Sequence, residues 1–204
     1  MSASPFIYHY IEGVERLECY QPGGYHPTRI GDCLHGRYRI VHKLGHGAYS
    51  TIWLARDDHL STFFAIKIGM ADSSRHEVDV LSRINATSPV PLLLKGSETR
   101  RKPLVPAVLD SFSIHGPNGT HFCSVTYPAS RSLEGAKKTS TCALFQLHVA
   151  RALVAQLAMA VAHVHAQSYV HGGQLVTGLS GQRGGCSLTV FVFQWHQSFH
   201  KRPV

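Results

Sequence analysis

The sequence is most informative at residues 43–55, which read Lys-Leu-Gly-His-Gly-Ala-Tyr-Ser-Thr-Ile-Trp-Leu-Ala. Two runs rich in β-branched and aromatic residues, 38–44 and 50–55, flank a turn that contains Gly45 and Gly47. This arrangement predicts a β-hairpin. Its glycines would let the backbone approach a phosphate chain and direct N–H groups at it. A glycine-containing turn is weak evidence alone, because many hairpins have one.

A third strand and a helix are expected after the hairpin. Residues 62–68 favour a strand that carries Lys67. Ser73 or Ser74 can cap a helix, and Glu77 lies at capping-box distance from Ser74. The apolar side of that helix would hold Val78, Leu81 and Ile84.

Two further strands and a long helix complete the predicted elements. A proline-containing loop over 86–107 precedes strands at 108–114 and 121–126, which a tight turn joins. The five strands predict an antiparallel sheet. Apolar residues recur at three- and four-residue steps over 143–167, which predicts an amphipathic helix. After His171, glycines interrupt the pattern, and the uncharged run 188–193 is strongly β-prone.

Composition narrows the class of protein. The 204 residues and 22.5 kDa allow one domain, or one domain with a tail. The net charge is +8, but the basic residues are scattered, with the densest clusters at 100–102 and 137–138, which does not favour nucleic-acid binding. Five cysteines without a CxxC motif predict a reducing compartment, cytoplasmic or nuclear. We expect no signal peptide, because the start lacks a basic and apolar run, and no membrane-spanning helix, because the apolar stretches are interrupted.

The order of Gly45, Gly47, Lys67 and Glu77 resembles the N-lobe signature of protein kinases. In that signature a hairpin covers the phosphates, a strand lysine holds them, and a helix glutamate orients the lysine. Ser50 stands at the third glycine and Ile52 at the usual valine, which are mild departures. Among protein kinases, the chain resembles the SR-protein kinase family in particular. The residues that carry this resemblance are 24–32, 36–38, 43–55, 108–112 and 116–123.

The resemblance implies a fold, a cofactor and a set of binding residues. The fold is α+β, a protein-kinase-like N-lobe with an antiparallel sheet and one helix, followed by a C-lobe cut short after its first long helix. The family uses Mg-ATP to phosphorylate serines in Arg/Ser-rich proteins. Thr126 would be the gatekeeper behind the adenine, and Tyr127 to Ala129 the hinge. The implied nucleotide-binding residues are Leu44, Gly45, His46, Gly47, Ala48, Tyr49, Ser50, Ile52, Ala65, Lys67, Glu77, Thr126, Tyr127 and Ala129.

The same resemblance implies four regions along the chain. Residues 1–37 would be an N-terminal extension, and 38–130 the N-lobe with the hinge. Residues 131–171 would begin the C-lobe, and 172–204 would be a tail unlike kinase sequence. With so much of the C-lobe missing, we expect the long helix to lack the partners of its apolar face.

The catalytic loop departs from the family pattern. His171 stands at the histidine of that loop, but Gly173 stands at the catalytic aspartate and Gly178 at the magnesium-binding asparagine. Glycine can perform neither role. Residues after Glu134 include no Asp or Glu, so the sequence as given supplies no metal-binding DFG aspartate. We therefore assign no catalytic residue and no metal ligand, and expect this chain alone to be inactive.

Three interpretations remain open from the sequence. The first is a Ser/Thr protein kinase of the SR-protein kinase type, represented by an incomplete chain. The second is a non-catalytic pseudokinase fragment that binds a nucleotide or a partner. The third is a non-functional product of gene decay or of a faulty gene model, in which 173–204 is not native kinase sequence.

Overall fold

The computed structural model describes residues 14–71, 73, 75–86, 105–129, 131–138, 140, 144–171, 178–182, 185–189 and 199–201. Several predicted features lie outside these residues. They are the Ser74 cap, residues 87–104 of the predicted loop, the catalytic-loop position Gly173, and residues 190–193 of the β-prone run.

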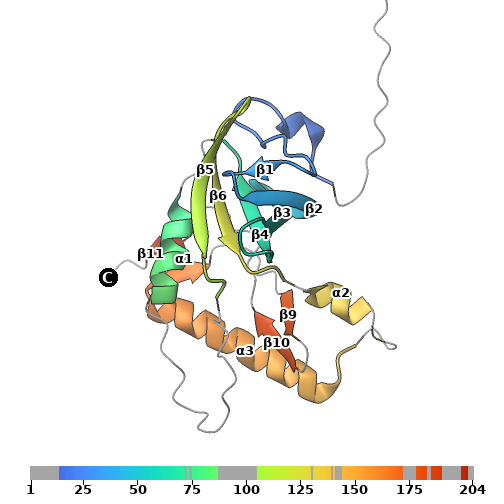
Figure 1. Cartoon of the computed structure of the whole chain (residues 1–204). Helices are drawn as coiled ribbons and strands as arrows, with labels where there is room; N and C mark the ends of the chain where they lie inside the picture. Colours follow the sequence, from blue (N-terminus) through green and yellow to red (C-terminus); the bar gives the residue numbers. More distant parts are fainter. Residues whose placement is uncertain are drawn as a thin grey trace, which may run out of the picture.

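The centre of the molecule is a six-stranded sheet in the order β1-β2-β3-β4-β6-β5, with all neighbours antiparallel (Figure 1). Its strands are β1 Cys33–Leu34, β2 Tyr38–Gly47, β3 Ser50–Asp57, β4 Phe63–Gly69, β5 Asp110–Gly116 and β6 Gly119–Thr126. The five predicted strands are confirmed, with ends that shift by a few residues. The added strand β1 has two residues, which is too short to produce an alternating pattern.

Alternation along the strands gives this sheet two different faces. One face builds the main core, and burial there raises the pKa of the Cys123 thiol to about 12, so Cys123 is a core residue as predicted. The buried core residues are Leu34, Tyr38, Ile40, Trp53, Ala55, Phe64, Ile66, Ile68, Phe112, Cys123 and Val125. Residues at the alternate positions, such as Ile52 and Lys67, share the opposite face because the register pairs them directly.

Helix α1, His76–Ala86, follows β4 and packs its own small cluster. Leu81 and Ile84 are buried as predicted, but the third buried helix residue is Val80, while Val78 is only half-buried. Val105, which precedes β5 in the chain, packs with them. The predicted apolar side of α1 was therefore slightly displaced around the helix. The segments that pack against α1 decide which of its side chains are buried, and sequence spacing does not show them.

Helix α3, Leu147–Ala166, crosses the lower part of the molecule in Figure 1. It begins at Leu147 rather than at Ala143, and Gln146 makes no side-chain cap there. The buried residues of the helix are Ala160 and His163. Two short elements not predicted from the pattern are the 3₁₀ turn η1, Leu17–Cys19, and helix α2, Leu133–Lys138.

Helix α3 also corrects an expectation about membranes. The helix has 20 residues, and an 18-residue window within it has a mean hydropathy of 1.5, so it is long and apolar enough to cross a membrane by length and composition. The expectation considered only uninterrupted apolar runs. In the helix, Arg151 is the one formally charged residue, so the interruptions leave the segment apolar on average. This single helix is weak evidence for a membrane span, because the long apolar helix of a soluble protein passes the same test.

The chain after the hinge forms small sheets of its own. Strand β7, Arg131–Ser132, pairs with β9, Gly178–Gln182, which pairs with β10, Gly185–Thr189. Strand β8, Tyr169–His171, pairs with β11, Phe199–Lys201. The start of the predicted β-prone run, residues 188–189, therefore lies in a strand.

Residues 14–28, here called the N-terminal strap, pack against the sheet rather than standing apart from it. Glu15 and Tyr25 are 6% and 4% exposed. The backbone N–H of Gly23 donates to the carbonyl oxygen of Asn118 at 2.8 Å. The strap is thus packed onto the sheet, whereas the sequence analysis placed it in an N-terminal extension.

Candidate functional site

The predicted phosphate-binding turn is the β2–β3 connection. Gly47 pairs with Ser50, so Ala48 and Tyr49 form a two-residue turn. Two register irregularities occur along β2, one of them between Lys43 and Gly45. Such bulges bend a strand and increase its twist, and this one leaves Leu44 outside the regular pairing and 42% exposed.

A row of paired residues runs across the sheet beneath this turn. Gly45 pairs with Ile52, Ile52 pairs with Lys67, and Lys67 pairs with Ser124. Directly paired residues of antiparallel strands project from the same face. The glycine and the lysine therefore share a face, which is opposite to the face that builds the main core.

Lys67 is held by the glutamate of α1. Its ammonium nitrogen Nζ lies 2.6 Å from Oε1 and 2.7 Å from Oε2 of Glu77. The two side chains are 18% and 26% exposed, so the pair is largely but not fully withdrawn from water. Holding a long lysine side chain in one position reduces the ordering cost when it meets an anion. This pair is the arrangement that the resemblance to the kinase N-lobe signature implied.

The same face offers space and an apolar wall. A Cβ atom added at Gly45 would meet no other atom within 4 Å, so the face is open above the glycine. Ile52 and Ala65 are 4% and 2% exposed, and Ala65 pairs with Thr126 at the end of β6. Apolar side chains beside an open space are what a flat heteroaromatic ring requires.

The chain leaves the sheet after Thr126, at the position where the family resemblance places a hinge. Tyr127 is 55% exposed, and its ring centroid lies 5.9 Å from that of Phe64. Tyr127 and Ala129 have no regular secondary structure, so their backbone groups are not used in the sheet ladder.

The predicted binding residues fall into two groups in the structure. Gly45, Ile52, Ala65, Lys67 and Thr126 share one sheet face, and Glu77 reaches that face from α1. The other predicted residues lie around that face: His46, Gly47, Ala48, Tyr49 and Ser50 at the turn, Leu44 in the bulge, and Tyr127 and Ala129 after β6. Of these, His46 pairs with Thr51, which projects from the core face.

Two residues near the site were missed by sequence reasoning. Ser124 pairs with Lys67 and belongs to the same row. Tyr25 of the N-terminal strap donates its hydroxyl to the carbonyl oxygen of Gly47 at 2.8 Å. No local pattern could reveal either contact, because each joins segments distant in sequence.

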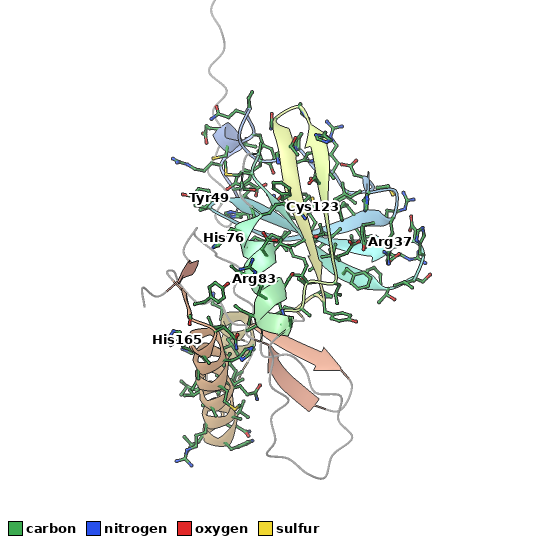
Figure 2. The ribbon with its side chains drawn as sticks, turned by 90° about the vertical axis from the view of Figure 1, so that its left-hand side faces the viewer. Arg37, Tyr49, His76, Arg83, Cys123 and His165 are labelled. Carbon is green, nitrogen blue, oxygen red and sulfur yellow. The ribbon has the colours of Figure 1, made fainter. Side chains whose placement is uncertain are left out.

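An ion pair with a buried carboxylate lies away from the turn. Arg37 and Tyr49 stand at opposite ends of the sheet in Figure 2, with Cys123 between them. Arg37 lies 2.7 Å from the buried carboxylate of Asp57, which also accepts N–H bonds from His59 and Leu60. The Arg37 guanidinium lowers the pKa of Asp57 to about 2. This network stabilises the β3–β4 turn and is structural rather than part of the candidate site.

Comparisons with known proteins support the kinase resemblance. No family model matches the chain. A serine/threonine protein kinase of Aspergillus fumigatus is 32% identical over 157 residues, which cover 76% of this chain and 38% of that protein. SRSF protein kinase 3 of Homo sapiens is 36% identical over 111 residues, covering 52% of this chain and 18% of that protein. The serine/threonine-protein kinase SRPK of Physarum polycephalum is 36% identical over 117 residues, covering 54% and 25%.

The identifiable homologues of this chain are thus Ser/Thr protein kinases, and SR-protein kinases are among them. The chain spans about two fifths or less of the length of these relatives. The family resemblance read from the motifs is confirmed, and the α+β fold with an antiparallel sheet and few helices agrees with it.

Proposed function

We propose, from the homology to SR-protein kinases, that this chain binds ATP on the Lys67 face of its sheet without transferring phosphate by itself. The observation that carries the proposal is the bond of Lys67 to both oxygens of Glu77. It supports a poised lysine below an open glycine turn, which suits a polyanion. The Arg/Ser-rich substrates of the family enter this proposal only by that homology.

The residues present fit a nucleotide. Lys67 would hold the phosphates as a cation, and the turn at Gly45 and Gly47 would cover them with backbone N–H groups. Ile52 and Ala65 would contact the base, and the hinge at Tyr127 to Ala129 would offer backbone groups to its edge. Bound ATP would supply the transferable phosphoryl group; the protein's own contribution is orientation.

The residues present do not fit the magnesium ion that the family uses. Both carboxylate oxygens of Glu77 are engaged by Lys67. Residues 135–204 contain no Asp or Glu. Oxygen ligands of these types are the ones that magnesium requires from a protein. We therefore assign no residue to a metal, and Gly173, at the position that the resemblance gives to the catalytic aspartate, would leave the substrate hydroxyl without a proton acceptor.

Thermal unfolding with and without ATP tests nucleotide binding. A ligand that binds the folded state at 100 times its Kd adds about 2.7 kcal/mol of stability. We expect this stabilisation in the wild type and its loss in Lys67→Ala. Arg39→Ala is the matched control, since it removes an exposed cation that pairs with Asp58 at 2.9 Å elsewhere on the sheet; it should keep the ATP response.

Incubation with radiolabelled ATP and an Arg/Ser-rich peptide tests catalysis. We expect no incorporation of phosphate, with an active SR-protein kinase as the positive control. Incorporation that Lys67→Ala abolishes would contradict the non-catalytic part of the proposal. A wild type that shows neither stabilisation nor transfer would favour the third interpretation, a product without function. Sequencing the mature transcript downstream of the Tyr169 codon would then decide whether residues 173–204 are the encoded sequence.

A further inference from the structure

The N-terminal strap places a buried phenol against the phosphate-binding turn. The hydroxyl of Tyr25 donates to the carbonyl oxygen of Gly47 at 2.8 Å and lies 3.1 Å from that of Ala48. The side chain is 4% exposed, and burial raises the pKa of this tyrosine. The hydroxyl therefore keeps its proton at neutral pH and stays a donor.

The strap is fixed to parts of the sheet that do not belong to the turn. The side-chain amide of Asn118, in the β5–β6 turn, donates to the carbonyl oxygen of Tyr25 at 2.6 Å. The N–H of Ala71, just after β4, donates to the carbonyl oxygen of Gly24 at 2.9 Å. A Cβ atom at Gly24 would come within 1.9 Å of the carbonyl oxygen of Cys19, so the strap turn is tight. These contacts hold the backbone at Tyr25 in place against the sheet.

A second anchor ties the strap to the strand that leads into the turn. The buried carboxylate of Glu15 accepts hydrogen bonds from the Tyr20 hydroxyl and from the ammonium group of Lys43 on β2. The Tyr20 and Tyr25 rings lie 5.5 Å apart. The strap and the first strand of the hairpin therefore form one connected unit.

The strap lies on the sheet face opposite Lys67. Lys43 pairs in register with Trp53, a residue of the core face, and its Nζ lies 5.2 Å from the Trp53 ring. His26 packs edge-on against His121 at 5.0 Å, and His121 shares its face with Cys123 of the core. Tyr25 therefore approaches the turn from the side away from the candidate site.

This approach fixes the direction of the turn N–H groups. The described residues contain no cis peptide bond, and in a trans peptide the C=O and the following N–H point in opposite directions. The Gly47 carbonyl accepts from the Tyr25 hydroxyl, so the Ala48 N–H points away from that hydroxyl. The Ala48 carbonyl likewise sets the direction of the Tyr49 N–H. Successive N–H groups on one side of a turn form an anion-binding concavity.

We propose that Tyr25 is a positioning residue for the nucleotide phosphates: by holding the carbonyls of Gly47 and Ala48, it aims the turn N–H groups at the phosphate side. This inference rests on the proposed ATP binding. Tyr25 touches no ligand in this scheme and acts through the backbone of the turn. Its effect must then appear for ligands with phosphates and be absent for adenosine, which has none.

Isothermal titration of Tyr25→Phe with ATP and with adenosine is the test. Phenylalanine keeps the buried ring and removes only the hydroxyl. We expect the Kd for ATP to rise about 3- to 10-fold, as for the loss of one net hydrogen bond, and the Kd for adenosine to stay within about twofold. The ratio of the two constants is independent of the folded fraction, since partial unfolding weakens both apparent affinities equally.

Tyr20→Phe is the matched control, because it removes the neighbouring hydroxyl, which bonds Glu15 and not the turn. It should leave the ratio unchanged. Equal weakening of ATP and adenosine in Tyr25→Phe would reduce Tyr25 to a structural residue and overturn the inference. ATP binding as tight as in the wild type would also overturn it, while leaving the proposed function intact. A wild type that binds neither ligand would overturn both.

Discussion

The sheet region and helix α3 differ in how completely their apolar side chains are packed. In the sheet region, the interior positions of β3, β4 and β6 close over a common core, and the buried carboxylate of Asp57 is paired with Arg37. Helix α3 is anchored mainly at its C-terminal end, where His163 contacts the carbonyl oxygen of Ile84 at 3.2 Å. Its earlier turns leave Leu147, Val154 and Met159 at least half exposed.

This difference in packing bears on where the residues of the proposed kinase-like site lie. Every residue proposed to hold the nucleotide belongs to the sheet region, to α1 or to the hinge, and the main core lies beneath that same sheet. Under the proposal, the chain around and after α3 would have to supply proton transfer and metal binding, and its sequence has Gly173 at the expected aspartate position and no carboxylate after Glu134. The proposed binding residues therefore all lie in or beside the well-packed sheet region.

Two substitutions, one in the core and one in α3, test the difference in packing between the two regions most directly. Ile66 is 0% exposed in the central strand β4, and Ile66→Ala should lower the free energy of unfolding by about 2–5 kcal/mol, because it removes buried methylenes and leaves a cavity. Val154 of α3 is 65% exposed, and Val154→Ala should change the same quantity by about 0.5 kcal/mol or less. Urea unfolding measures both. Similar losses at the two positions would show that α3 is buried by a partner.

Acid unfolding would sharpen the picture of the sheet region. Arg37 lowers the pKa of Asp57 from 3.8 to about 2, so the folded state holds this carboxylate ionised more strongly than the unfolded chain does. The stability from this pair is present above about pH 4 and is lost as the pH falls towards 2. Asp57→Asn should be less stable at pH 7 and show a shallower loss between pH 4 and 2. Asp58→Asn, which breaks an exposed pair with Arg39, should keep the wild-type slope.

A smaller effect is expected where the strap meets the sheet. Burial, with His121 nearby, lowers the pKa of His26 below its ordinary 6.5, although Asp32 opposes this. The unfolded chain then binds the proton more readily, so stability is complete above about pH 6.5 and falls below it. Thermal melts between pH 7.5 and 5 should show a smaller decrease in His26→Gln than in the wild type. The exposed His42→Gln variant should follow the wild type; a flat wild-type profile would contradict the prediction.

Local sequence patterns were sufficient for the hairpin, β4, the β5–β6 pair and the two longer helices. Alternation and turn residues determine such elements over a few positions. The Lys67–Glu77 pair was also predictable, because the order of strand, lysine, helix and glutamate resembles a known signature. The stripe of α1 was placed less well, with Val80 buried in place of Val78, since its flanking segments lie far away in sequence.

Residue type and order were enough to predict the glycine turn, the lysine and its glutamate, and the family resemblance was enough to place Gly173 at the position of the catalytic aspartate. Only the tertiary structure decided that Gly45, Ile52 and Lys67 share an open face, and that Tyr25 reaches Gly47 from the other side. These contacts join segments far apart along the chain. Their partners are selected by strand register and by packing, which no local period of the sequence encodes.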